Sequence, residues 1–237
     1  MSSDALQTRI AERLAAVRQR LATAAERSGR TSGAVRLIAV SKTFGADAVR
    51  AAYAAGQLDF GENRVQEALG KRAELADLPI RWHLIGPLQS NKARKVPGAF
   101  AWVHTLDRLD LLERLEAASP ATPHTPLPLL LQVDLAREAS KSGADESALR
   151  PLLDRARACQ TVQVVGLMLV PPYEADPERV RPWFARLRGL RDALRAEGVP
   201  PSQLQQLSMG MSHDFEVAIE EGATMVRVGS AIFGARD

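Results

Sequence analysis

The sequence predicts a closed (β/α)8 barrel, in which eight parallel strands are surrounded by helices and preceded by one extra N-terminal helix. Short β-rich runs alternate with amphipathic stretches of helix length along the 237 residues, which is typical of a parallel sheet. Eight such strand–helix units fill a chain of this length. An open doubly wound sheet is the alternative, but the turn at residues 41–45 lacks the glycine-rich GxGxxG motif that usually accompanies that fold.

The first expected element is an amphipathic helix over residues 4–27. Leucine, isoleucine and valine recur there at helical spacing, with charges of both signs between them. The interrupted apolar pattern differs from that of a signal peptide, and the acidic residues differ from a transit peptide. We therefore expect a cytoplasmic protein.

Each expected strand is a short apolar run, and each expected helix is a longer amphipathic stretch. The strands lie near residues 35–40, 58–60, 80–85, 101–105, 127–133, 164–170, 204–207 and 224–228. The helices between them lie near residues 46–55, 63–77, 89–95, 107–118, 145–159, 177–197 and 213–221. The proline-rich segment 119–128 is expected to be a surface loop. No linker divides the chain, so residues 1–237 should form a single domain.

Composition argues against several classes of protein. Hydrophobic residues make up 46% and charged residues 25%, which are ordinary values for a globular chain. The net charge of +3 is too small to indicate a nucleic-acid partner, and the apolar runs are too short to span a membrane. The single cysteine excludes an internal disulfide, and the four histidines lack metal-ligand spacing, so no metal is expected. We also expect a monomer.

Lys42 is the first candidate site residue. Functional groups of such barrels follow the C-terminal ends of the strands, and Lys42 directly follows the first strand, on the side of Ile38 and Val40. An ammonium group that is partly desolvated there loses its proton more easily and can act as a nucleophile toward an aldehyde. The alternative, which position alone favours, is a lysine whose stem packs at a strand end while its charge stays in water.

The loops after strands seven and eight form a second candidate, because barrels often bind phosphate there. Residues 208–212 offer two serine hydroxyls and a glycine amide before a helix, and Gly229 and Ser230 open another helical segment. Together these groups could hold a phosphate through backbone N–H groups and hydroxyls. The alternative is two ordinary capped helix starts.

Arg227 shares a strand face with Met225 and Gly229, and we expect it to point into the barrel. A buried guanidinium needs an acceptor, which could be a ligand atom or a barrel carboxylate. His83 is expected to be a hydrogen-bonded core histidine. Asn63 either contacts a ligand or caps the following helix. The methionines at 168, 209 and 211 are expected to serve packing.

At these residues the chain resembles the pyridoxal-phosphate homeostasis proteins, single-domain relatives of the alanine racemase N-terminal barrel. The similarity runs in register from about residue 10 to the end. It is carried by AVSKT at 39–43, FGEN at 60–63, WHLIG at 82–86, LQSNK at 88–92, LSMGMS at 207–212 and VRVG at 226–229. The chain departs from the usual pattern at Arg64, where the family usually has tyrosine, in segment 132–138, and at Ser230, where threonine is frequent.

The resemblance implies a binding site for pyridoxal 5′-phosphate (PLP). It implies that Lys42 forms a reversible internal aldimine with the PLP aldehyde. It also implies that Arg227 faces the pyridine nitrogen and that Asn63 contacts the ring. The phosphate would be held by Ser212, Gly229 and Ser230, with Ser208 and Met209 nearby.

The resemblance further implies a carrier that buffers PLP, or delivers it to apo-enzymes or amines, without catalytic residues of its own. Two features agree with this. Asp237 ends the chain just after the barrel, so we expect no C-terminal β-domain. An arginine at the pyridine nitrogen disfavours ring protonation and so weakens the cofactor as an electron sink. The alternatives are a PLP-dependent amino-acid racemase or related enzyme and a Schiff-base aldolase that needs no cofactor; a nucleic-acid-binding role comes last.

Overall fold

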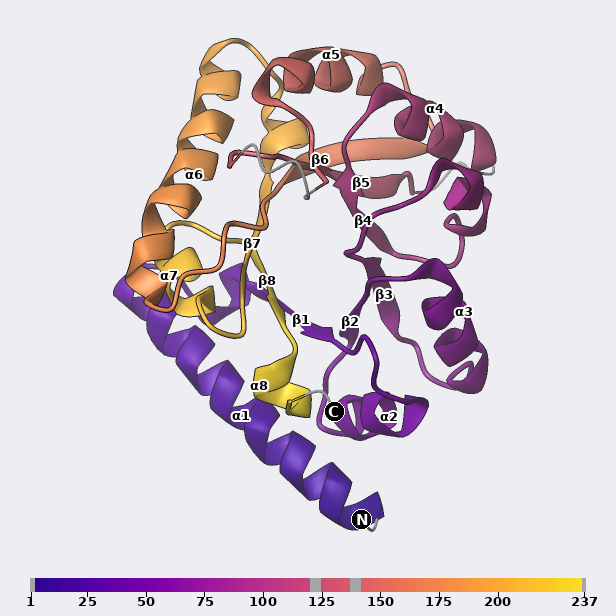
Figure 1. Ribbon diagram of the computed structural model, residues 1–237, viewed down its shortest axis with the longest axis vertical. Helices are drawn as coiled ribbons and strands as arrows, with labels where there is room; N and C mark the ends of the chain where they lie inside the picture. Colours follow the sequence, from indigo (N-terminus) through magenta and orange to yellow (C-terminus); the bar gives the residue numbers. More distant parts are fainter. Residues whose placement is uncertain (1–2, 120–124, 137–141, 236–237) are drawn as a thin grey trace.

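The computed structural model describes residues 3–119, 125–136 and 142–235, and these form a closed barrel of eight parallel strands. The strands are β1 (Arg36–Val40), β2 (Asp59–Glu62), β3 (Arg81–Leu84), β4 (Trp102–Leu106), β5 (Leu127–Gln132), β6 (Val162–Met168), β7 (Gln206–Met211) and β8 (Met225–Val228). Each strand pairs with the next one along the chain, and β8 pairs with β1 to close the ring (Figure 1). The predicted barrel is therefore confirmed.

Helices surround this ring. The α-helices are α1 (Ser3–Arg27), α2 (Ala46–Ala54), α3 (Val65–Glu74), α4 (Leu109–Ala118), α5 (Glu146–Ala156), α6 (Arg181–Ala196), α7 (Phe215–Glu220) and α8 (Ser230–Phe233). Short 3-10 segments are η1 (Ser32–Ala34), η2 (Ser90–Lys95), η3 (Pro177–Val180) and η4 (Pro201–Leu204). The extra helix α1 lies outside the barrel against α2, α7 and α8 (Figure 1), because its apolar stripe of Ile10, Leu14, Val17 and Leu21 is buried there.

Three elements differ most from the sequence prediction. The seventh strand was expected at 204–207 but runs from Gln206 to Met211, because the paired proline at 200–201 holds Leu204 in a 3-10 turn. The helix expected at 177–197 divides into η3 and α6, with a proline in the first turn of each. The helix expected at 89–95 is a 3-10 segment. Residues 120–124 of the expected 119–128 loop, and Asp237, lie outside the described residues, and the single domain over 1–237 stays a prediction.

Apolar residues pack in two layers. The larger layer lies between the strands and the surrounding helices, and a smaller cluster fills the barrel interior with Ile38, Leu130, Val165, Met168 and Met225. The interior also holds buried polar side chains, among them His83, His104 and Arg227. Because one face of each strand lies toward the interior, polar residues at alternating positions of several strands meet there.

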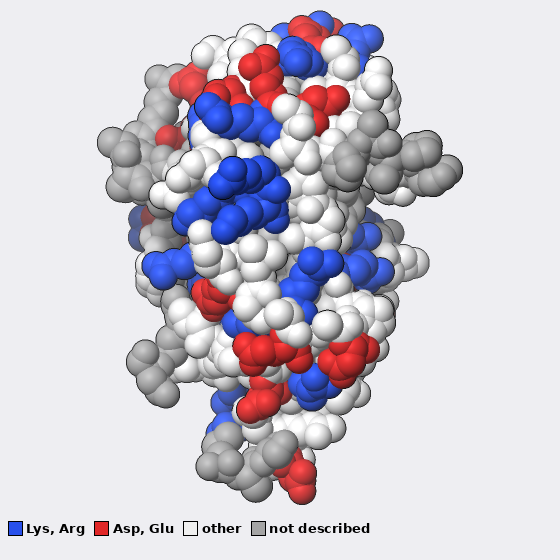
Figure 2. Space-filling view, turned by 90° about the vertical axis from the view of Figure 1, so that its right-hand side faces the viewer, with Lys and Arg blue, Asp and Glu red and all other residues white. Residues whose placement is uncertain are grey.

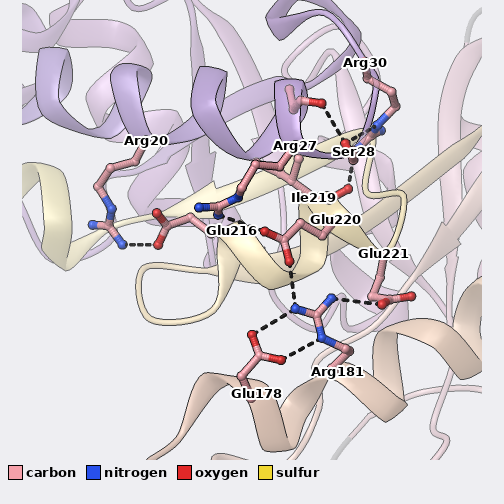
Figure 3. A network of polar contacts seen from close by, with 11 residues as sticks. Arg20, Arg27, Ser28, Arg30, Glu178, Arg181, Glu216, Ile219, Glu220 and Glu221 are labelled. Carbon is pink, nitrogen blue, oxygen red and sulfur yellow. Dashed lines mark hydrogen bonds and ion pairs between the residues drawn. The ribbon is translucent and has the colours of Figure 1, made fainter.

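Ion pairs connect α1 to the C-terminal part of the barrel (Figure 3). Arg20 on α1 contacts Glu216 on α7 at 2.6 Å, and Arg27 contacts Glu220 at 2.8 Å. Arg181, at the start of α6, also contacts Glu220 at 2.7 Å, so Arg27, Glu220 and Arg181 form a network. The network holds α7, the helix that follows β7, against the outside of the barrel.

Basic and acidic side chains lie on the same face of the molecule (Figure 2). On the face that carries α3 and α4, basic side chains gather at the centre with acidic ones above and below them (Figure 2). The segment η2, which packs against α4, contains Lys92, Arg94 and Lys95. In the part of the chain that the structure describes, no helix is both long enough and apolar enough to cross a membrane.

Candidate functional site

A cavity of about 580 Å³ opens at the C-terminal ends of the strands. It brings together six of the residues that the sequence singles out: Lys42, Asn63, Ser212, Arg227, Gly229 and Ser230. These residues come from the ends of β1, β2, β7 and β8, so barrel closure is what makes them neighbours.

Lys42 lies in a short loop whose neighbouring residues are firmly held. The buried Ser41 hydroxyl donates to Glu62 Oε1 at 2.6 Å, and the Thr43 amide donates to Glu67 Oε1 at 2.7 Å. Thr43 has a φ of 70°, a left-handed conformation that a threonine adopts only when its surroundings hold it there. The backbone on both sides of Lys42 is therefore fixed.

A second lysine, Lys71, organises this support. Its Nζ, on α3, donates to Ser41 O at 2.7 Å, to Glu62 Oε1 at 2.7 Å and to Glu67 Oε1 at 2.8 Å. Burial raises the pKa of the Glu62 carboxyl, although the hydrogen bonds from Lys71 and Ser41 act in the opposite direction. Sequence reasoning missed this cluster; the Glu67–Lys71 spacing of four residues was a visible signal, but the burial of Lys71 under the Lys42 loop was not.

The part of the cavity where we expect the phosphate, at the loops after β7 and β8, contains a hydroxyl and several amides. Ser212 Oγ accepts hydrogen bonds from the amides of Gly229 at 3.0 Å and Ala231 at 3.4 Å. Asp214 accepts from the Met211 amide at 2.6 Å, and burial raises its pKa. The loops after β7 and β8 are thus joined to each other, and the phosphate site there stays a prediction.

Arg227 points into the barrel, as predicted, and lines the floor of the cavity. Its Nη1 donates to Ser208 Oγ at 2.7 Å and its Nη2 to Leu169 O at 2.8 Å. The protein acceptors are therefore a hydroxyl and a carbonyl rather than a carboxylate. Burial lowers the pKa of Arg227 to about 10, with the charge of Asp214 acting against this, so the guanidinium stays charged at neutral pH.

Two expected site residues do not line the cavity. Ser208 is fully buried inside the barrel below Arg227, and Met209 is buried in the outer layer against the helices. Both were expected in a loop, and both lie within β7 because that strand continues to Met211. Met168 and Met211, which were expected only to pack, line the cavity instead.

His83 is a hydrogen-bonded core histidine, as expected. Its Nε2 lies 2.9 Å from Asp59 Oδ1, and its Nδ1 lies 3.0 Å from His104 Nε2. His104 Nδ1 lies 2.9 Å from Ser208 Oγ. Sequence reasoning did not identify Asp59 or His104 as part of this arrangement.

Asn63 lines the cavity wall, and Tyr173 lies at the cavity rim. Arg64, not Asn63, occupies the N-cap position of α3, so Asn63 does not cap that helix, and it lines the cavity. Gly86 permits this placement, since a Cβ there would lie 2.3 Å from Asn63 O. At the rim, Tyr173 is 80% exposed and its ring centroid lies 5.8 Å from that of His213.

Within the described ranges, no three histidine, cysteine, aspartate or glutamate side chains gather as a metal site would require. The expectation of a metal-free protein therefore stays a prediction, and His124 lies outside the described residues.

The fold and the site define a class of parallel β/α barrels that carry a lysine after the first strand and a hydroxyl–amide pocket after the last two. Comparison with known proteins identifies the family within this class. The family model of the alanine racemase N-terminal domain matches residues 13–237. The chain is 50% identical over 228 residues to the pyridoxal phosphate homeostasis protein of Pseudomonas aeruginosa, covering 96% of each chain. It is 43% identical to the same-named protein of Aquifex aeolicus, covering 95% of this chain and 97% of that one. The chain belongs to the pyridoxal phosphate homeostasis protein family.

Solved structures agree with this assignment. PipY of Synechococcus elongatus with PLP bound is 44% identical, has a TM-score of 0.83, and covers 95% of this chain and 100% of its own. Alanine racemase from E. faecalis, at 19% identity and a TM-score of 0.62, covers 92% of this chain and 58% of its own. The racemase likeness concerns the fold alone.

Proposed function

We propose that this protein binds PLP in the cavity at the C-terminal end of the barrel and acts as a PLP carrier in the cytosol. The observation that carries the proposal is the meeting, in one cavity, of an amine, a guanidinium and a hydroxyl–amide pocket. These three kinds of group match the aldehyde, the ring nitrogen and the phosphate of PLP. The 44% identity to PipY, a protein solved with PLP bound, supports the same proposal.

Lys42 supplies the amine. Lys42 would hold PLP through Nζ, and bound PLP would supply the aldehyde carbon that an amine can bind reversibly, which is what a carrier requires. The hydrogen bonds that hold Ser41 and Thr43 fix the position of the lysine backbone.

The other groups orient the ligand. The hydroxyls of Ser212 and Ser230 donate hydrogen bonds to the phosphate, the Gly229 amide holds the Ser212 hydroxyl in place, and Asn63 contacts the ring. Ser208 and Met209 act only through neighbouring groups, since neither side chain lines the cavity. Arg227, charged at neutral pH, donates to the ring nitrogen and disfavours its protonation, so the ligand is a weak electron sink. We therefore assign a carrier role, with apo-enzymes or free amines as recipients.

The first test is an absorbance spectrum of the protein with PLP, before and after borohydride, followed by peptide mapping. A reducible band that maps to Lys42 and disappears in Lys42→Ala is expected. Lys92→Ala, a change in the basic surface segment η2, serves as the matched control and should keep the band. No band, or label distributed over surface lysines, would overturn the proposal.

A racemase remains the second candidate because Tyr173 lies at the cavity rim, where a second acid or base would be needed. Exchange of the Cα proton of amino acids with solvent deuterium distinguishes the two functions. A carrier produces no enzyme-dependent exchange over a broad panel of amino acids. Catalytic exchange that is lost in Tyr173→Phe would establish the enzyme instead.

A further inference from the structure

A continuous line of hydrogen bonds crosses the barrel interior beneath the cavity. It joins one side chain from each of five strands, which we call the interior network: Asp59, His83, His104, Ser208 and Arg227. The four links measure between 2.7 and 3.0 Å, and every member of the network is at most 5% exposed. Only the Arg227 end lines the cavity.

The two ends of the interior network determine which atom donates the proton in each of its hydrogen bonds. Arg227 can only donate, so the Ser208 oxygen accepts from it and the single hydroxyl proton is directed to His104 Nδ1. Burial, together with the positive charge of the surrounding groups, lowers the pKa of His104 well below its ordinary value, so the ring is neutral. Its proton therefore resides on Nε2 and is donated to His83 Nδ1, and His83 in turn donates from Nε2 to Asp59.

The far end of the network is anchored outside the cavity. Asp59 is the first residue of β2, at the end of the barrel opposite the cavity, and accepts from Arg81 Nε at 2.9 Å and Nη2 at 2.6 Å. Burial acts to raise the pKa of Asp59, but the hydrogen bonds from His83 and Arg81 outweigh it and hold the pKa below its usual value. The network therefore runs from a fixed anion to the buried cation of the cavity floor.

We propose that the four network residues below Arg227 are positioning residues, which fix its guanidinium as a hydrogen-bond donor to an unprotonated aromatic nitrogen of the ligand. The guanidinium is planar, so bonds from Nη1 to Ser208 and from Nη2 to Leu169 fix its plane and aim its remaining N–H groups. The inference rests on the proposed function and adds to it: the pocket selects ligands by a ring nitrogen that accepts a hydrogen bond.

The test is a binding cycle with two ligands and two proteins. The ligands are PLP and its 1-deaza analogue, in which C–H replaces the ring nitrogen; the proteins are wild type and Ser208→Ala. Hydrogen bonds to charged groups are each worth a roughly tenfold to hundredfold change in affinity, so Ser208→Ala should weaken PLP binding by about that factor. The 1-deaza analogue has no acceptor to lose, and its affinity should change less than about threefold.

Thr105→Val is the matched control. Thr105 is the buried neighbour of His104 on β4, and its hydroxyl donates to Gly86 O, outside the interior network. This change should affect both ligands equally. Asp59→Asn, a change that touches no cavity residue, should again weaken PLP more than the analogue, and it replaces Ser208→Ala if that variant fails to fold.

Nitrogen NMR of the histidine rings tests the network without any ligand. Both His83 and His104 should be neutral with the proton on Nε2 at neutral pH. A proton on His104 Nδ1, a charged His104, or equal weakening of both ligands by Ser208→Ala would overturn the positioning role. Failure of wild type to bind PLP at Lys42 would instead reject the proposed function, whatever the histidine spectra show.

Discussion

Replacement of Lys71 by methionine tests the support beneath the Lys42 loop. Methionine keeps most of the apolar stem but removes the three hydrogen bonds that Nζ donates to Ser41, Glu62 and Glu67. Glu62 is fully buried, and its second carboxylate oxygen has no hydrogen-bond partner among the described residues. Removing one partner of a buried ion pair costs about 3–5 kcal/mol, so we expect Tm to fall by roughly 6–20 °C in a chain of this size.

The stability lost in Lys71→Met should depend on pH in a defined direction. Burial already raises the pKa of Glu62, and without Lys71 the folded-state pKa rises further. A carboxyl whose folded pKa lies above its unfolded value of about 4.3 costs little stability below that pH and more as pH rises toward the folded pKa. The deficit of Lys71→Met in urea unfolding should therefore be larger at pH 8 than at pH 5.

The double variant Glu62→Gln/Lys71→Met provides the control, because it removes the buried charge together with its partner. We expect it to recover at least half of the lost free energy of unfolding. A deficit below about 1 kcal/mol in Lys71→Met, or one that Glu62→Gln leaves unchanged, would refute the reasoning.

Three further predictions follow from single contacts. Ser212→Ala removes the acceptor for two loop amides and a donor for phosphate, so PLP should bind about tenfold more weakly, as fluorescence titration would measure; unchanged affinity would contradict this role. Gly86→Ala puts a Cβ 2.3 Å from Asn63 O and should cost about 1–3 kcal/mol in urea unfolding. Gly70→Ala, on an open helix position, should instead add about 0.5–1 kcal/mol, and equal effects of the two would refute the packing argument. The pKa of Asp59 is lowered in the folded protein, so its carboxylate stabilises the fold above about pH 4. The loss of unfolding free energy in Asp59→Asn should therefore shrink as pH falls below that value. A loss that is constant from about pH 3 to about pH 6 would contradict this.

Much of the fold and part of the site were predictable because they depend on local patterns. Period-two alternation put Lys42 and Arg227 on the interior side of their strands, and the order of strands and helices implied a closed barrel. The end of β7 was not predictable from hydrophobicity alone. Pairing of Ser208 with Met225 and of Met211 with Arg227 extends that strand through a polar, glycine-containing run that reads locally as a loop.

By itself, then, the sequence determined the barrel, the loops that meet at its C-terminal end and the lysine and arginine that face the cavity. Tertiary structure alone decided that Lys71 lies under the Lys42 loop, and that Asp59, His83 and His104 connect through Ser208 to Arg227. The physical reason is that alternation along one strand says which face a residue occupies, but not its height in the barrel. That height follows from the stagger between paired strands, which is established only when β8 pairs with β1 and the ring closes.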